Sequence, residues 1–137
     1  MNQTGYTKSF LHLGILLAFS VVAMIPMMID GIPGGMDIPQ QYQFAQSYAK
    51  SIQEGVLLPV WADQPNFGYG DISVRFYPPL AYYVLYVFQL LSGNWFDATI
   101  LFVISMFFVC AVGMYSWASE WFSKNSALFA GIVSIFL

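Results

Sequence analysis

Asp37 is the carboxylate in this sequence whose position most suggests chemistry. It stands two residues before Pro39, where a helix is predicted to begin, and Gln40 follows three residues after it. A helix N-terminus keeps a carboxylate ionised, which suits a general base. The same spacing is also that of a capping box, in which the two side chains satisfy the first backbone groups of the helix. The sequence alone leaves both roles open.

Lys50 and Arg75 are the only basic residues in the long polar segment around Asp37. Arg75 directly precedes an aromatic and proline-rich stretch at the expected level of the lipid headgroups. A guanidinium there offers a two-pronged contact for a phosphate, which makes Arg75 the better phosphate candidate of the two. The same residue can instead simply anchor a helix end among the headgroups.

The composition of the chain predicts that these residues belong to a membrane protein. Apolar residues make up 58% of the sequence and charged residues only 8%, whereas soluble domains carry about 25% charged residues. Four basic residues and a net charge of −3 also argue against nucleic-acid binding.

Four apolar stretches predict an all-α polytopic membrane protein with a transmembrane helix bundle. They cover about residues 10–29, 77–93, 98–118 and 126–137. The first, as a helix, would cross about 30 Å of hydrocarbon. Pro78 and Pro79 are expected to start the second helix. Because the fourth stretch ends while still apolar, we expect residues 1–137 to be the N-terminal part of one longer transmembrane domain.

The loop between the first two predicted spans, residues 30–76, is expected to carry an amphipathic surface helix over residues 39–54. That helix should end before Gly55, a natural C-cap, and lay its apolar face on the membrane surface or on neighbouring spans. Its apolar positions are Ile38, Tyr42, Ala45, Tyr48, Ala49 and Ile52, and its polar positions are Gln40, Gln43, Gln46, Ser47, Lys50 and Glu54.

Aromatic and polar side chains near the second predicted span suggest two further features. Tyr82, Tyr86 and Gln89 recur on one helical face, so they should face protein or a cavity. Helix packing and a groove for a lipid donor both explain that face. An interfacial aromatic belt is predicted for Phe67, Tyr69, Phe76, Tyr77, Tyr82 and Tyr83. Two single residues, His12 and Cys110, are expected to pack within spans.

Several motifs follow one another in a fixed order from Asp37 onward. They are E-G at the end of the predicted helix, L-P-V-W, the turn N-F-G-Y-G, and F-Y-P-P-L-A-Y-Y at the next span. In this order they resemble the GT-C superfamily of membrane glycosyltransferases. They are similar in particular to the polytopic proteins labelled 6-pyruvoyl-tetrahydropterin-synthase-related membrane proteins, a label that implies no pterin chemistry.

The resemblance implies a GT-C-like fold and a multi-pass protein of the cytoplasmic (inner) membrane. Residues 30–76 and 120–125 would lie outside, and residues 92–97 inside. Asp37 would be the catalytic base, and the donor would be a sugar on a polyprenyl phosphate. Lys50 and Arg75 are then candidate phosphate contacts, and Gln41, Tyr82 and Tyr86 are further candidate substrate contacts; Gln41 stands where the family often carries histidine.

The expected partners are membrane lipid, the polyprenyl-phosphate donor and the C-terminal remainder of the same chain. No organic cofactor is expected, although some relatives use a metal, and Asp30, Asp37 and Asp71 are candidate ligands for a divalent cation. A non-catalytic membrane protein of lipid or polysaccharide assembly is the main alternative. A transporter is disfavoured because the predicted spans contain no Asp, Glu, Lys or Arg.

Overall fold

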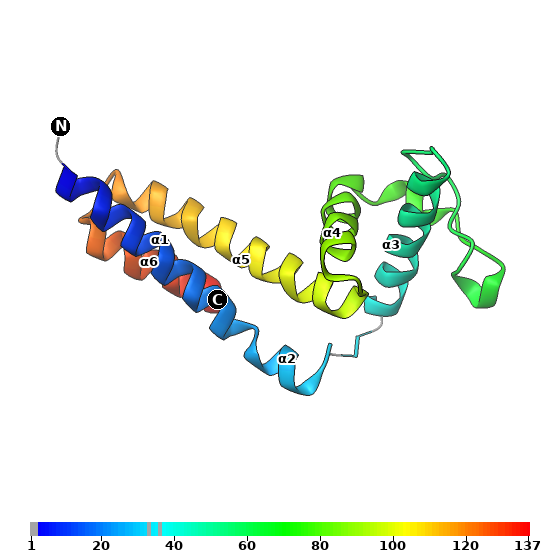
Figure 1. Ribbon diagram of the computed structural model, residues 1–137, viewed down its shortest axis with the longest axis horizontal. Helices are drawn as coiled ribbons and strands as arrows, with labels where there is room; N and C mark the ends of the chain where they lie inside the picture. Colours follow the sequence, from blue (N-terminus) through cyan, green and yellow to red (C-terminus); the bar gives the residue numbers. More distant parts are fainter. Residues whose placement is uncertain (1–2, 33, 36) are drawn as a thin grey trace. The chain divides into compact units, whose positions relative to one another are not determined.

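The computed structural model describes residues 3–32, 34–35 and 37–137, with side chains described from Ser9 onward. Over these residues the chain forms helices and one isolated β-bridge, and no strand (Figure 1). The elements are α1 (Gln3–Ala23), α2 (Ile25–Asp30), α3 (Ile38–Gln53), the 3-10 helices η1 (Asn66–Gly68) and η2 (Ser73–Phe76), α4 (Pro79–Ser92), α5 (Trp95–Ser119) and α6 (Lys124–Phe136). The all-helical prediction is confirmed for this part of the chain.

Two segments are long and apolar enough to cross a membrane, judged by length and composition. They are Ser9–Asp30, which α1 and α2 share, and Trp95–Ser119, and each has a mean hydropathy of 2.2. The apolar helices α4 and α6 have 14 and 13 residues, about 20 Å at the helical rise, which is less than the roughly 30 Å of hydrocarbon. Two of the four predicted spans are therefore supported, and the other two stay predictions.

The chain divides into two compact units, and the first combines the segment up to Gly31 with Val103–Leu137. Here α1, α6 and the later part of α5 share a core built from Leu16, Ala111, Tyr115, Ala118, Ala127 and Ile135. At Gly131 an added Cβ would lie 2.9 Å from the carbonyl oxygen of Ala111 and 3.0 Å from Leu16. The helices therefore approach closely at a glycine, as is common where helices pack in membranes.

The two single residues expected to pack within spans differ in outcome. His12 is buried, its Nδ1 lies 3.2 Å from the hydroxyl of Tyr115, and the two rings meet edge to face. Its predicted packing role is confirmed. Cys110 is exposed, so its expected burial is wrong. The buried stripe of α5 contains Ala111 and Tyr115, four residues apart, and Cys110 lies off that stripe by about 100°.

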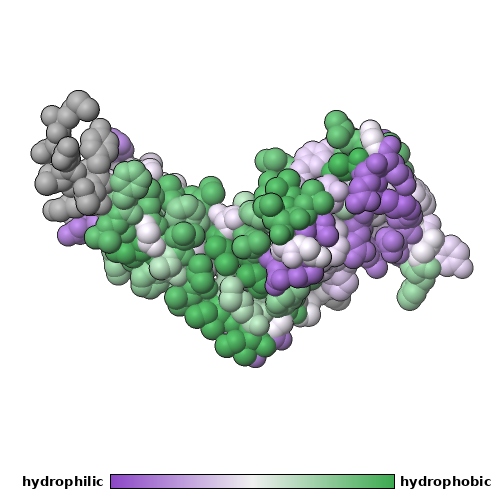
Figure 2. Space-filling view, in the orientation of Figure 1, coloured by the Kyte–Doolittle hydropathy of each residue, from purple (hydrophilic) through white to green (hydrophobic). Residues whose placement is uncertain are grey.

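The second unit is Ile32–Phe102 and contains α3, the long loop, α4 and the start of α5. Its core consists of Phe44, Ala45, Tyr48, Ala62, Val74 and Tyr82. Hydrophilic residues gather on this unit, whereas hydrophobic side chains cover most of the visible surface of the helices in the first unit (Figure 2). The polar segment singled out in the sequence therefore folds as a body with its own core.

The ends of α3 and α4 lie close to where the sequence predicted them. Gly55, directly after the C-cap of α3, adopts a positive φ of 84°. The Gly55 N–H donates to Ile52 O at 3.0 Å, and the Val56 N–H donates to Ser51 O at 2.7 Å. These two bonds make a Schellman motif, which satisfies carbonyls at the helix end. Helix α4 begins at Pro79 and ends before Gly93.

The buried face of α3 is wider than predicted. Ala45, Tyr48 and Ala49 are buried as expected, but so are Phe44, at 0% exposure, and Ser47, at 3%. A helix lying on a membrane buries one stripe, whereas α3 is covered by α4 on one side and by the loop after it on another. The apolar face packs on α4, the predicted second span, as one of the two expected arrangements requires.

Candidate functional site

Asp37 occupies the N-cap position of α3 without capping the helix through its side chain. Its backbone has helical angles (φ −91°, ψ −21°), and no side-chain cap hydrogen bond forms. A capping side chain needs an extended backbone to reach the next N–H groups, and Pro39 has no N–H to offer. Gln40 Nε2 instead lies 3.5 Å from Asp71 Oδ2. The capping-box interpretation is therefore wrong, and the exposed Asp37 carboxylate makes no bond to the helix.

Arg75 lies in η2 with its side chain exposed. The preceding residue, Val74, is completely buried in the core of this unit, so η2 is held in place while Arg75 and Phe76 project outward. Among the described residues, no ion pair joins Arg75 to Asp37. The guanidinium is accessible to an anion in this part of the chain.

Lys50 forms an exposed ion pair with Asp63. The hydrogen bond and the opposite charge of Lys50 lower the pKa of Asp63, and the same contact raises the pKa of Lys50. An incoming phosphate would have to compete with Asp63 for the ammonium group. Arg75 is therefore the more available of the two predicted phosphate contacts.

Tyr82 and Tyr86 of α4 face α3, which confirms the prediction that they face protein or a cavity. Tyr82 is buried, stacks on Tyr48 with ring centroids 4.8 Å apart, and donates a hydrogen bond of 2.5 Å to Gln41 Oε1. Tyr86 is also buried, and its hydroxyl accepts a hydrogen bond of 3.3 Å from Gln53 Nε2. Two predicted substrate contacts, Gln41 and Tyr82, thus bind each other, which favours the packing role.

The predicted aromatic belt divides into two groups. Phe67, Tyr69, Phe76 and Tyr77 are exposed. The expectation is wrong for Tyr82, which is buried against Tyr48. Tyr83 is partly exposed, its ring also contacts Tyr48, and its hydroxyl donates to Leu57 O at 2.5 Å, so its place in the belt stays a prediction. Aromatic residues near a predicted span can therefore belong to an internal contact between helices.

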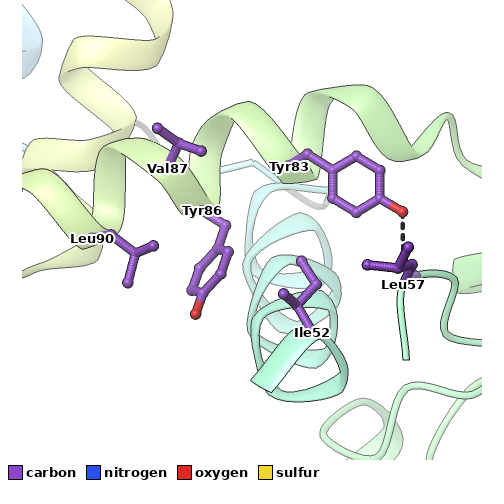
Figure 3. Close-up of a pocket in the computed structure, with 6 residues that line it drawn as sticks. All are labelled: Ile52, Leu57, Tyr83, Tyr86, Val87 and Leu90. Atoms are coloured by element: carbon purple, nitrogen blue, oxygen red, sulfur yellow. Dashed lines mark hydrogen bonds between the residues drawn. The ribbon is translucent and has the colours of Figure 1, made fainter. Parts of the chain in front are cut away.

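An apolar cavity of about 380 Å³ opens where α4 passes the C-terminal end of α3. Tyr86 and Leu90 of α4 and Ile52 of α3 border it, with Tyr83 bonded to Leu57 at one side (Figure 3). Val87 completes the lining. Tyr86 therefore both packs on α3 and contributes to a cavity wall whose chemistry suits a hydrocarbon chain.

Asp71 has a structural role in the loop. Its backbone pairs with that of Ala62 through hydrogen bonds of 2.9 and 2.8 Å. Its Oδ1 accepts the Ser73 N–H at 2.7 Å, and the hydrogen bonds from Ser73 lower its pKa. Asp30 belongs to the other unit. The part of the chain that the structure describes contains no group of three His, Cys, Asp or Glu that could hold a metal ion, so we propose no metal site.

A second cavity, polar and of about 160 Å³, lies on another face of α3 and was not predicted from the sequence. Its lining is Ser47, Lys50, Ser51, Glu54, Trp61 and Asp63. Three of these residues belong to α3 and Glu54 is its C-cap residue. Lys50 and Ser51 each lie three or four positions from both Ser47 and Glu54, and this spacing is the signal that could have marked the face. The contribution of Trp61 and Asp63 comes from the fold of the loop, which local patterns do not predict.

The comparisons with known proteins bear on the C-terminal part of the chain. Residues 74–137 match the 6-pyruvoyl-tetrahydropterin synthase related domain, a membrane protein family. This PTPS-related match begins just before Arg75 and includes α4, α5 and α6, slightly less than half of the chain. It agrees with the family resemblance of the sequence motifs and with a membrane protein. Asp37, Lys50 and Trp61 precede it. No curated protein and no solved structure matches the chain.

Proposed function

We propose that this chain is the N-terminal part of a GT-C-like membrane glycosyltransferase that uses a polyprenyl-phosphate sugar donor. The observation that carries the proposal is the Asp37 carboxylate, which is exposed at the start of α3 and makes no capping bond. An exposed carboxylate that makes no capping bond, at the place where the motifs resemble the family, can serve as a general base. The PTPS-related match over residues 74–137 supports the narrower resemblance of the sequence motifs to PTPS-related membrane proteins.

The proposed reaction moves one sugar from phosphate to an acceptor hydroxyl. The acceptor oxygen attacks the anomeric carbon while Asp37 takes the hydroxyl proton, and the bond between that carbon and the phosphate oxygen breaks. Polyprenyl phosphate leaves with the bonding electrons, and the exposed guanidinium of Arg75 stabilises its negative charge. Asp37 and Arg75 belong to the same compact unit.

The other predicted substrate contacts take secondary roles in this proposal. Tyr86 borders the apolar cavity, where part of a prenyl chain would contact it. Gln41 and Tyr82 hold α3 against α4, and so position the helix that follows Asp37. We place the protein in the cytoplasmic membrane with residues 30–76 outside, where the acceptor would approach.

The test is sugar transfer by the full-length protein in membrane vesicles. A panel of polyprenyl phosphates carrying different radiolabelled sugars would be supplied, and labelled acceptor would be measured. Asp37→Asn should insert normally but lose about 10²- to 10⁴-fold in transfer rate, the usual contribution of a general base. Asp30→Asn is the matched control, since it makes the same change at another exposed carboxylate, and it should keep transfer near the wild-type rate.

The outcomes separate the candidate functions. Wild-type transfer by Asp37→Asn would mean that the base lies elsewhere. If the wild type transfers no sugar from any donor in the panel, the alternative of a non-catalytic protein of lipid or polysaccharide assembly replaces the enzyme.

A further inference from the structure

We propose that the polar cavity beside α3 binds a single uncharged sugar ring, with Trp61 as the stacking platform. The cavity lies between the polar face of α3 and the loop segment that carries Trp61 and Asp63. It is distinct from the apolar cavity, which shares none of its lining residues. Four features of the site indicate an uncharged sugar ring as its ligand.

The first feature is the fixed indole of Trp61. A Cβ added at Gly70, where φ is +80°, would lie 2.5 Å from each of three indole atoms, Cε2, Cζ2 and Nε1. These three atoms form one outer edge of the indole, so Gly70 lies against that edge of the ring. The paired backbones of Ala62 and Asp71 hold the two segments together. Trp61 is nevertheless 52% exposed, so this backing leaves much of the indole open to a ligand.

The second feature is the set of polar groups around the indole. Ser47 lines the cavity from a nearly buried position, at 3% exposure, and its Oγ donates to Gln43 O at 2.8 Å. The carboxylate of Glu54 and the Lys50–Asp63 pair are exposed around the same cavity. Carboxylates accept strong hydrogen bonds from hydroxyl groups. A sugar ring presents both an apolar C–H face for the indole and a rim of hydroxyls for these groups.

The third feature is charge, which argues against an anion. The lining contains one cation, Lys50, and two carboxylates, Glu54 and Asp63. Its net charge is therefore negative, and the cation is already paired. A free phosphate or a sugar acid would meet repulsion, whereas a neutral polyol would not.

The fourth feature is size. The cavity of about 160 Å³ is smaller than the roughly 300 to 1,000 Å³ of pockets that enclose drug-sized ligands. It suits one ring rather than an oligosaccharide. A hydrocarbon chain is a poor fit because charged and hydroxyl groups make up most of the lining.

This inference goes beyond the proposed transfer reaction and does not require it. Asp37 and Arg75 do not line the cavity, and a non-catalytic protein of polysaccharide assembly would also use a sugar-binding site. Binding and transfer can therefore succeed or fail separately.

The test measures binding of free monosaccharides to the full-length protein in phospholipid nanodiscs. Detergents with sugar headgroups must be avoided, because they would compete for the site. Saturation-transfer NMR would be recorded during titration with glucose, galactose, mannose and N-acetylglucosamine. At least one should bind saturably, and Trp61→Ala should bind it about tenfold more weakly, as expected for the loss of a stacking contact.

Control variants separate a binding effect from a folding effect. Trp121→Ala is the matched control, because Trp121 is 73% exposed in the other unit, and it should bind like the wild type. Trp61→Phe keeps an aromatic face and should lose less than Trp61→Ala, with an unchanged helical circular dichroism spectrum. Asp37→Asn should bind normally, and inorganic phosphate should not compete. Absence of saturable binding in the wild type, or equal losses in Trp61→Ala and Trp121→Ala, would overturn the proposal.

Discussion

The two faces of α3 are covered in different ways. Toward α4, Phe44 and Tyr48 are buried in a closely packed aromatic cluster. On the polar face, Lys50 and Glu54 border an open cavity that Trp61 of the loop also lines. An amphipathic helix in a membrane-protein loop is usually placed flat on the lipid surface. Here the apolar side is occupied by a neighbouring helix, and the polar side is partly enclosed rather than simply solvated.

This difference suggests that the two faces of α3 have different roles. The face toward α4 packs in the core of the unit, and we propose that the polar face and the N-terminal end present groups for ligands. Substitutions on the first should therefore change stability, and substitutions on the second should change binding or transfer with little change in stability.

The largest effect is expected at Tyr48, which is buried between Tyr82 and Tyr83. Tyr48→Asp would place a charge in this cluster and remove the stacking, at a cost of at least about 3 to 5 kcal/mol, the range for truncating a buried aromatic. Gln46→Asp introduces the same side chain two residues earlier, at a partly exposed position, and should be nearly neutral. Thermal unfolding and the yield of monodisperse protein measure both. Equal tolerance at the two positions would mean that the α3–α4 contact does not stabilise the unit.

A smaller and more selective effect is expected at Gly70. Gly68 and Gly70 both have a positive φ, but an added Cβ meets Trp61 only at Gly70 and finds nothing within 4 Å at Gly68. Both changes to alanine should therefore cost about 1 to 2 kcal/mol of backbone strain. Gly70→Ala should in addition displace the indole, shift the Trp61 emission and weaken sugar binding. If Gly68→Ala weakens binding as much as Gly70→Ala, the platform is not held by this contact.

Local signals predicted the helices of the second unit well. Gly55 stops α3 and Pro79 starts α4 because a positive φ and a missing N–H act within a few residues of themselves. The facing direction of Tyr82 and Tyr86 also followed from helical spacing alone. The hydrogen-bond partners of these tyrosines, Gln41 and Gln53, could not be predicted from helical spacing, because the bonds join residues far apart in the sequence.

The path of the loop was the part that sequence patterns could not predict. Asn66 and Phe67 both adopt a positive φ, which is uncommon for residues with side chains, and the turn they make returns the chain so that Gly70 lies against Trp61. The Lys50–Asp63 pair depends on the same path. At Asp37, residue types favoured a cap, but the backbone angles prevented it. The polar cavity and the uncapped carboxylate are thus consequences of tertiary structure.

The claim that Asp37 is free of a capping role is tested most directly by comparing Asp37→Asn with Asp37→Ala. Both variants lose the charge near the helix N-terminus, but asparagine caps a helix and alanine does not, a difference of about 1 kcal/mol at a true cap. Ser123→Ala is the positive control, because Ser123 Oγ accepts the Ser126 N–H of α6 at 3.2 Å, and its thermal unfolding midpoint should fall. We expect the two Asp37 variants to unfold at the same temperature. The contradicting result is a lower unfolding midpoint for Asp37→Ala than for Asp37→Asn, with a difference as large as the one between Ser123→Ala and the wild type. Asp37 would then be a structural cap.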